Sequence, residues 1–183
     1  MPQAEIDAVV WAALQQGHRK ALDYIFEKHI RLLYAYGARI TADVLLVEDC
    51  IQDIFVELWK RRERLSATDN IKFYLMKCLR RNLERKLQVG ARERARYAHA
   101  AEYMDSHYAS AENHLIELQT LSEQQQQLSR ALEKLSQRQR EAVYLKFYEK
   151  MPYEQLAEVL HIDLKSTYKL IGKAIESLRR IMK

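Results

Sequence analysis

The scarcity of glycine and proline is the feature that most limits what this chain can fold into. Of its 183 residues, 4 are glycine and 2 are proline. Such a chain has few residues suited to tight turns and little scope for β-hairpins, so we expect an all-α fold. The glycines are too scattered to form a phosphate-binding loop, and no G-x-S-x-G turn is present. The sequence therefore argues against most nucleotide-binding enzymes and against serine hydrolases.

The apolar runs and the cysteines place the chain in a reducing, aqueous compartment. The run AVVWAAL at residues 8–14 is far shorter than the roughly 20 residues of a membrane span, and no basic segment precedes an apolar one at the N-terminus. The 2 cysteines, Cys50 and Cys78, form neither a disulfide framework nor a C-x-x-C zinc motif. We expect a cytoplasmic protein without membrane insertion, cofactor or metal site.

Charge is distributed unevenly along the chain. The net charge is +5, and basic residues gather in 77–86 and again after Asp163. The stretch 111–129 between them carries acidic residues and no lysine or arginine. Two basic segments separated by an acidic one predict two surfaces that contact the same polyanion.

Helical periodicity predicts two small helical domains, residues 1–87 and 112–183, joined by a linker at 88–111. Ser136 and Gln139 form a capping-box pattern, and Asp163 is a suitable N-cap for the last helix. The last two predicted helices, joined by a three-residue turn, have the arrangement of a helix-turn-helix. The expected helices are 5–15, 19–36, 45–63, 71–87, 112–134, 137–149, 153–160 and 164–181.

The last predicted helix has an apolar face and a basic face. We expect the first face to be buried: Leu164, Thr167, Ile171, Ala174, Ile175 and Leu178. The opposite face carries Lys165, Ser166, Lys169, Lys173 and Arg180. A basic face on the second helix of a helix-turn-helix fits the major groove of DNA. The alternative is an ordinary solvated helix face.

Two more helices carry candidate binding residues. Lys77, Arg81 and Arg85 recur every four residues, next to aromatic residues and the polar loop 66–70, which suits a partly unpaired DNA strand. The alternative is that Phe73 simply packs in the core. In the third helix, Asp49 and Asp53 flank Gln52 on one face. Such carboxylates could serve catalysis or bind a metal, but an exposed acidic helix face more often binds a basic protein surface.

Several segments resemble bacterial sigma-70 family factors of the extracytoplasmic-function group. Residues 47–59, VEDCIQDIFVELW, resemble the helix with which these factors grip the clamp of RNA polymerase. Residues 17–21, GHRKA, followed by Ile25 and Phe26, resemble the start of region 2. Residues 135–142 and 153–160 resemble region 4. These blocks occur in the family's order, and together with the unmatched linker between them they span nearly the whole chain.

The resemblance implies three sets of contacts. The polymerase clamp would meet Asp49, Gln52, Asp53 and Phe55, and helices within 112–149 would touch the polymerase flap. The −10 promoter element would meet Ser66, Thr68, Asp69, Asn70, Lys72, Tyr74, Lys77, Arg80 and Arg81. The −35 element would meet Lys165, Ser166, Lys169, Lys173 and Arg180. The family also implies an anti-sigma partner.

Some positions depart from the family pattern: Arg81 stands where many members have Asn, and His161 replaces the usual Gly of the turn. The sequence thus predicts a sigma factor that catalyses no reaction itself. A helix-turn-helix regulator that binds duplex DNA independently of the polymerase is the first alternative. A helical adaptor that binds only protein and a Mg²⁺-dependent nuclease using Asp49 and Asp53 are the others.

Overall fold

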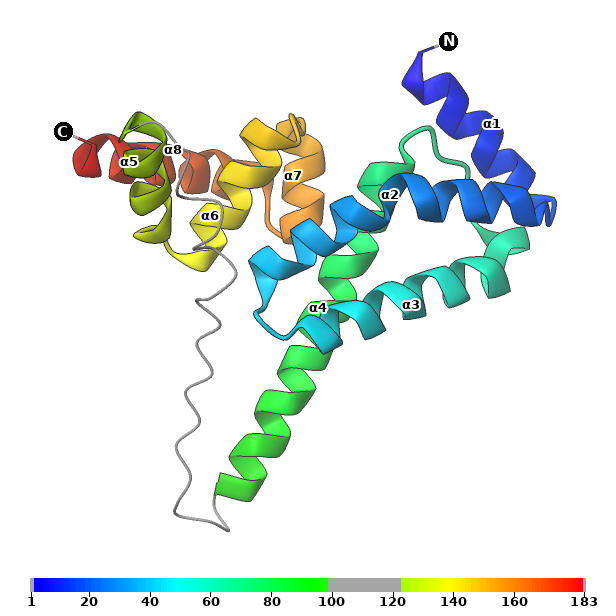
Figure 1. Ribbon diagram of the computed structural model, residues 1–183, viewed down its shortest axis with the longest axis horizontal. Coiled ribbons are helices and arrows are strands. Elements are labelled where there is room, and N and C mark those ends of the chain that lie inside the picture. The colour runs from blue at the N-terminus through cyan, green and yellow to red at the C-terminus, as the bar shows by residue number, and fades with distance from the viewer. Residues whose placement is uncertain (1, 99–122, 183) are drawn as a thin grey trace. The chain divides into compact units, whose positions relative to one another are not determined.

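The described part of the chain is built from helices. A computed structural model describes residues 2–98 and 123–182, and every regular element within those ranges is a helix. The expected all-α fold is therefore confirmed. The chain divides into two compact units, Met1–Met104 and Asp105–Lys183, each of which is considered by itself (Figure 1).

The first unit packs three long helices against one another. Its α2, α3 and α4 make contacts in all three pairs, and α1 lies against α2 and the 3₁₀ turn η1 (Figure 1). Apolar stripes at helical spacing face inward, and Leu33, Ile51 and Leu79 are almost fully buried. The elements are α1 (Gln3–Gln15), α2 (Arg19–Ile40), α3 (Val44–Arg61), η1 (Arg62–Arg64) and α4 (Ile71–Ala98).

Gly37 does not end a helix, contrary to the expected break after residue 36. α2 continues to Ile40, and Gly37 is buried inside it. A Cβ atom at this position would lie 2.5 Å from Cγ1 of Val47 on α3. Glycine is therefore needed here for the close approach of two helices rather than for a turn.

The helix α4 extends beyond its predicted end. Helical structure continues through Ala98, so the first part of the predicted linker 88–111 is helical; the remainder lies outside the described residues. The sequence interpretation failed here because apolar periodicity fades after Leu87, whereas charged residues with good helix propensity carry the helix on.

The second unit is a set of shorter helices around α8. Its elements are α5 (Glu123–Glu133), α6 (Gln137–Val143), the π-helical turn η4 (Tyr144–Tyr148), α7 (Tyr153–Leu160) and α8 (Leu164–Ile181). α8 contacts α5, α6 and α7. The capping box is present as predicted, with Ser136 and Gln139 bonded reciprocally. Of the helix expected at 112–134, residues 112–122 lie outside the described residues.

α7 and α8 are joined by a tight turn. Asp163 is the N-cap of α8, and its Oδ1 accepts a hydrogen bond of 2.8 Å from the Ser166 amide, as predicted. His161 ends α7 in the left-handed region, with φ of 50°. This is the position at which glycine is the usual residue.

Candidate nucleic-acid and protein interfaces

The acidic face of α3 is in contact with a lysine from α4. Asp49 and Gln52 are exposed and Asp53 is half-buried, so the structure brings these three predicted residues together. Lys86 Nζ lies 2.7 Å from Asp53 Oδ2 and also pairs with Asp49. Hydrogen bonds to these two carboxylates raise the pKa of Lys86. The sequence did not indicate this link, because it depends on how α3 and α4 pack.

Phe55 does not share that surface. Its side chain is buried at 8% exposure, and its ring packs edge-on against Phe26, with centroids 5.0 Å apart. Phe55 therefore lies in the core on the apolar stripe of α3, and its contact with the polymerase stays a prediction. The exposed neighbour in this pair is Phe26, at 43%.

The polar loop between η1 and α4 has residues of two kinds. Ser66 and Asp69 are exposed. Thr68 and Asn70 instead hold the loop's own backbone: Thr68 Oγ1 accepts from the Asn70 amide at 3.2 Å, and Asn70 Oδ1 accepts from the Phe73 amide at 3.0 Å. Asn70 thus caps the start of α4, and the exposed side chains are those available to a ligand.

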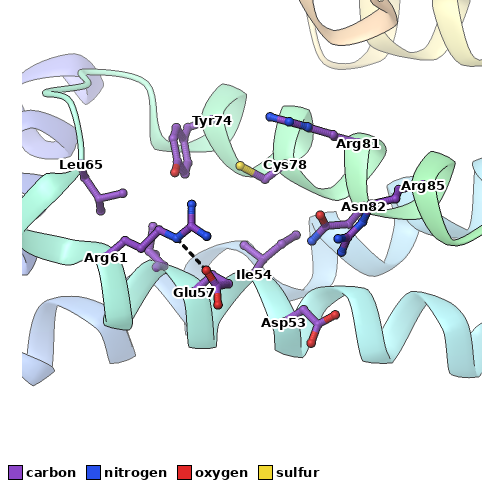
Figure 2. A pocket seen from close by; sticks show the side chains of 11 residues that line it. Asp53, Ile54, Glu57, Arg61, Leu65, Tyr74, Cys78, Arg81, Asn82 and Arg85 are labelled. Carbon is purple, nitrogen blue, oxygen red and sulfur yellow. Dashed lines mark ion pairs between the residues drawn. The ribbon is translucent and has the colours of Figure 1, made fainter.

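A groove of about 560 Å³ opens beside this loop, between α3 and α4. Figure 2 shows side chains of both helices facing it, with the ion pair between Arg61 and Glu57 on the α3 side; the two side chains lie 2.7 Å apart. Tyr74, Cys78, Arg81, Asn82 and Arg85 line it from α4. Aromatic and guanidinium groups around one groove can stack on bases and contact phosphates.

Two of the groove side chains on α4, Tyr74 and Cys78, are uncharged at neutral pH. Burial raises the pKa of Tyr74 to about 12, and burial also raises the pKa of the Cys78 thiol. Both groups therefore stay protonated and add no negative charge beside Arg81 and Arg85. Arg61, Cys78 and Asn82 were missed as groove residues, because Arg61 lies on another helix and the other two lack a charge signal.

Arg80 is a buried residue of α4. Its side chain is 7% exposed, and its guanidinium pairs with Glu84 at 2.7 Å. Its assignment to the −10 contacts stays a prediction. Arg81, one residue on, is exposed, because successive helical positions point about 100° apart. Lys72 and Lys77 are half-buried, and Lys77 Nζ lies 5.8 Å from the centre of the Phe73 ring.

The basic face of α8 is present as expected. Lys165, Lys169, Lys173 and Arg180 are exposed. Ser166 is half-buried, and its hydroxyl donates to Asp163 Oδ2 at 2.6 Å. That hydrogen bond serves the helix cap, so the exposed lysines are the donors that this face presents to solvent.

The sequence interpretation missed an aromatic side chain on the same face. Tyr168 is 50% exposed, and its ring packs on Tyr153 of α7 at 4.2 Å between centroids. Lys146 Nζ lies 4.1 Å from the centre of the Tyr153 ring. The sequence does place Tyr168 on this face, because Tyr168 follows Lys165 by three residues in the helix.

The opposite face of α8 is buried or half-buried, except at one residue. Thr167, Ile171 and Ala174 are buried, and Ile175 and Leu178 are half-buried. Leu164, which was predicted to be buried, is 39% exposed. It is the first residue of α8, where the helix has just left the turn.

Residues 2–98 and 123–182 contain neither a membrane-spanning helix nor a metal-binding cluster of side chains. No helix there is long and apolar enough to cross a membrane. No cluster of three or more His, Cys, Asp or Glu side chains in the same ranges could hold a metal ion. Asp49 and Asp53 are therefore not joined by a third ligand of these types in the described structure.

Two family models match the sequence in chain order. A model described as sigma-70 region 2 matches residues 25–93, and one described as sigma-70 region 4 matches residues 125–178. The first range contains the acidic face of α3 and the groove, and the second contains α7 and α8. No curated protein matches the chain.

Two solved structures are similar in fold. One is the sigma factor RpoE in complex with the anti-sigma factor NepR from Bartonella quintana, with a TM-score of 0.64 and 20% identity, covering 89% of this chain and 97% of that chain. The other is CnrH in complex with the cytosolic domain of CnrY, with a TM-score of 0.58 and 19% identity, covering 96% of each chain.

Proposed function

The chain belongs to the sigma-70 family of transcription initiation factors, and from this premise we propose that it is a sigma factor of the extracytoplasmic-function group that uses three surfaces. Region 2 in the first unit binds the polymerase and the −10 element. Region 4 in the second unit binds the −35 element. The observation that carries the proposal is that α3 and α4 together present an acidic face and an arginine-lined groove.

The acidic face of α3 binds the clamp of core RNA polymerase. Asp49 and Gln52 are exposed, and Asp53 stands beside them. An acidic patch of this kind attracts and orients a basic partner surface. The pairing of Lys86 with both carboxylates supports this assignment, since it places a cation where a partner's cation would bind.

The loop 66–70 and the neighbouring groove bind one strand of the melted −10 element. The exposed side chains of Ser66 and Asp69 offer hydrogen-bonding groups to a base edge. The groove offers Tyr74 and Arg81 to an unpaired strand. Extruding a base costs unstacking energy, which an aromatic wall and nearby cations can offset.

The exposed face of α8 binds the −35 element as duplex DNA. Lys165, Lys169 and Lys173 follow one side of the helix, and a helix of this kind fits the major groove. Lysines that contact phosphates supply affinity and set the register, but they carry little sequence information. Helices within residues 112–149 would meet the polymerase flap; of these, α5 and α6 contact α8.

We also propose two further properties of this chain. The chain itself catalyses no reaction, because it supplies binding surfaces to a polymerase that performs the chemistry in the cytoplasm. An inhibitory partner of the anti-sigma class binds it, by analogy with the similar structures, each of which holds such a factor or a partner domain.

Promoter-dependent run-off transcription tests the proposal directly. The wild-type chain is added to the core polymerase of the source bacterium, and transcripts are mapped beside those of Asp49→Ala/Asp53→Ala. Wild type should yield discrete start sites, and the double variant should bind core at least about tenfold more weakly. A variant at two exposed acidic residues of another helix, Asp23→Ala/Glu27→Ala, controls for net charge.

The outcomes separate this function from its alternative. Failure of a folded wild-type chain to bind core would contradict the proposal. Duplex-DNA binding at paired half-sites without polymerase would then favour the helix-turn-helix regulator.

A further inference from the structure

Three side chains of α1 bond in succession to the segment that carries the polar loop. Asp7, Trp11 and Gln15 are spaced by four, so they lie along one stripe of the helix. Gln15 Nε2 donates to the Leu65 carbonyl at 2.6 Å, and Trp11 Nε1 donates to the Ser66 carbonyl at 2.9 Å. At the other end of the loop, Asp7 Oδ2 accepts from the Ile71 amide at 3.0 Å.

The Asp7 contact is buried and the contacts of Trp11 and Gln15 are part-buried, which makes all three more costly to lose than fully exposed contacts. Trp11 is 1% exposed and Asp7 is 3% exposed. The Trp11 ring also packs edge-on against Tyr74, with centroids 4.9 Å apart. A buried polar group that loses its partner pays its desolvation cost in full. The stripe therefore fixes the loop's two ends and the first aromatic residue of the groove together.

The hydrogen bonds divide the loop into a held backbone and presented side chains. α1 holds the carbonyls of Leu65 and Ser66, and the loop's own Thr68 and Asn70 hold two amides. The side chains of Ser66 and Asp69 remain exposed. A ligand that meets these two groups meets a loop whose backbone is already ordered.

We infer that Trp11 and Gln15 are positioning residues that preorganise the loop 66–70 for an unpaired base of the −10 strand. This inference rests on the proposed function and adds α1 to it, although α1 carries none of the residues proposed to touch DNA. The physical reason is that ordering a flexible loop at the moment of binding lowers affinity, whereas a loop ordered beforehand avoids that cost.

The test compares two variants with a matched control in the holoenzyme. Gln15→Leu removes one donor, and Trp11→Phe removes the indole N–H while keeping an aromatic ring against Tyr74. Gln16→Leu makes the same chemical change one residue on, at an exposed position. The probe is a single-stranded oligonucleotide carrying the non-template −10 sequence of a promoter selected from a randomised duplex library by the wild-type holoenzyme.

We expect Gln15→Leu and Trp11→Phe each to weaken oligonucleotide binding about three- to tenfold. Binding to core polymerase and to a −35 duplex should stay within twofold of wild type, which a general loss of folding would not allow. Amide hydrogen exchange should be faster at residues 66–70 in both variants, with the core of α2 and α3 unchanged. Gln16→Leu should match wild type in every measurement.

A loop variant separates the two ways in which the inference could fail. Ser66→Ala/Asp69→Ala changes the proposed contact groups and leaves the α1 hydrogen bonds in place. If this variant loses oligonucleotide binding but Gln15→Leu and Trp11→Phe do not, the loop binds DNA and the positioning role is wrong. If the wild-type holoenzyme itself does not bind the oligonucleotide, the −10 function is wrong and the inference is overturned with it.

Discussion

The ammonium group of Lys86 lies 2.7 Å from Oδ2 of Asp53, so α4 contributes a cation to the acidic face of α3. The same group also pairs with Asp49. The Lys86 side chain is 25% exposed, and those of Asp49 and Asp53 are 61% and 45% exposed. The surface proposed for the polymerase clamp thus already carries one intramolecular counter-ion, and a partner's cation must share or replace it.

Replacing Lys86 should tighten binding to core polymerase. In Lys86→Met the two carboxylates keep their full negative charge, so we expect affinity to rise about two- to fivefold at low salt, and less at high salt. Fluorescence anisotropy of labelled protein titrated with core measures this. Lys60→Met, at an exposed lysine near the end of α3, is the control. Weaker binding by Lys86→Met would mean that Lys86 instead holds the carboxylates in their binding geometry.

Replacing Arg81 and replacing Arg80, its neighbour on α4, should affect different properties: the first DNA binding, the second stability. Arg81→Gln removes an exposed groove cation, so −10 strand binding should fall roughly tenfold with stability unchanged. Arg80→Gln leaves Glu84 without its buried partner, so the free energy of unfolding should fall by about 1–3 kcal/mol. Urea denaturation and oligonucleotide binding by the holoenzyme measure the two effects. Equal losses of DNA binding without destabilisation would contradict the burial of Arg80.

The two arginines also illustrate what could be predicted from sequence. Local signals were sufficient to place the helices, although not the ends of α2 and α4: the apolar stripe of α3, the capping box at Ser136 and the N-cap at Asp163 all follow from residues a few positions apart. Charge clusters predicted which segments are basic. They did not say which basic side chains are solvent-exposed, because burial of Arg80 depends on the helices that pack around it.

The features that could not be predicted from the sequence depend on contacts between segments that are distant along the chain. Lys86 meets Asp53 only because α4 crosses α3, and Trp11 meets Ser66 only because α1 lies beside the loop. Gly37 was misread for the same reason: its role is to admit Val47 of another helix. The family resemblance supplied surfaces by position, but it did not indicate that Phe55 and Arg80 are buried.

The salt dependence of −35 binding should report the lysines of α8. Each phosphate contact that is lost lowers the slope of log affinity against log salt by about 0.9. Lys169→Ala and Lys173→Ala should each reduce the slope by about that amount, for the holoenzyme on a −35 duplex from the selected promoter. Lys134→Ala, at an exposed site outside α8, should leave the slope unchanged. An equal change in all three variants would argue for a diffuse charge effect.

The stability of the first unit should fall as the pH falls below about 6.5, because of His29. Burial, and then the neighbouring Lys28, lower the pKa of His29; Lys72 acts in the same direction and Asp7 opposes them. Nε2 lacks a hydrogen-bond partner in the described part of the chain. With a native pKa below the unfolded one, the unfolded state takes up the proton first, so acid favours unfolding.

Comparison with His29→Gln isolates this contribution. The wild-type free energy of unfolding, relative to that of the variant, should decline by at most about 1.4 kcal/mol per pH unit below the unfolded pKa of roughly 6.5, and level off below the native pKa. Urea denaturation between pH 5 and pH 8, on the order of half a unit apart, measures the difference. Parallel curves for the two proteins would show that His29 titrates alike in both states.

Replacing His161 by glycine should stabilise the second unit. His161 ends α7 with φ of 50°, a conformation that costs a residue with a Cβ atom about 1–2 kcal/mol. Glycine removes this strain but gains about 0.4–1 kcal/mol of disorder in the unfolded chain. The strain is the larger effect, so His161→Gly should raise the free energy of unfolding by about 0.5–1 kcal/mol.

His161→Ala loses the imidazole but keeps the Cβ atom, so it should give no gain in the free energy of unfolding. Thermal and urea denaturation of all three proteins decide the matter: if alanine stabilised as much as glycine, the imidazole rather than the backbone would be the source of the strain.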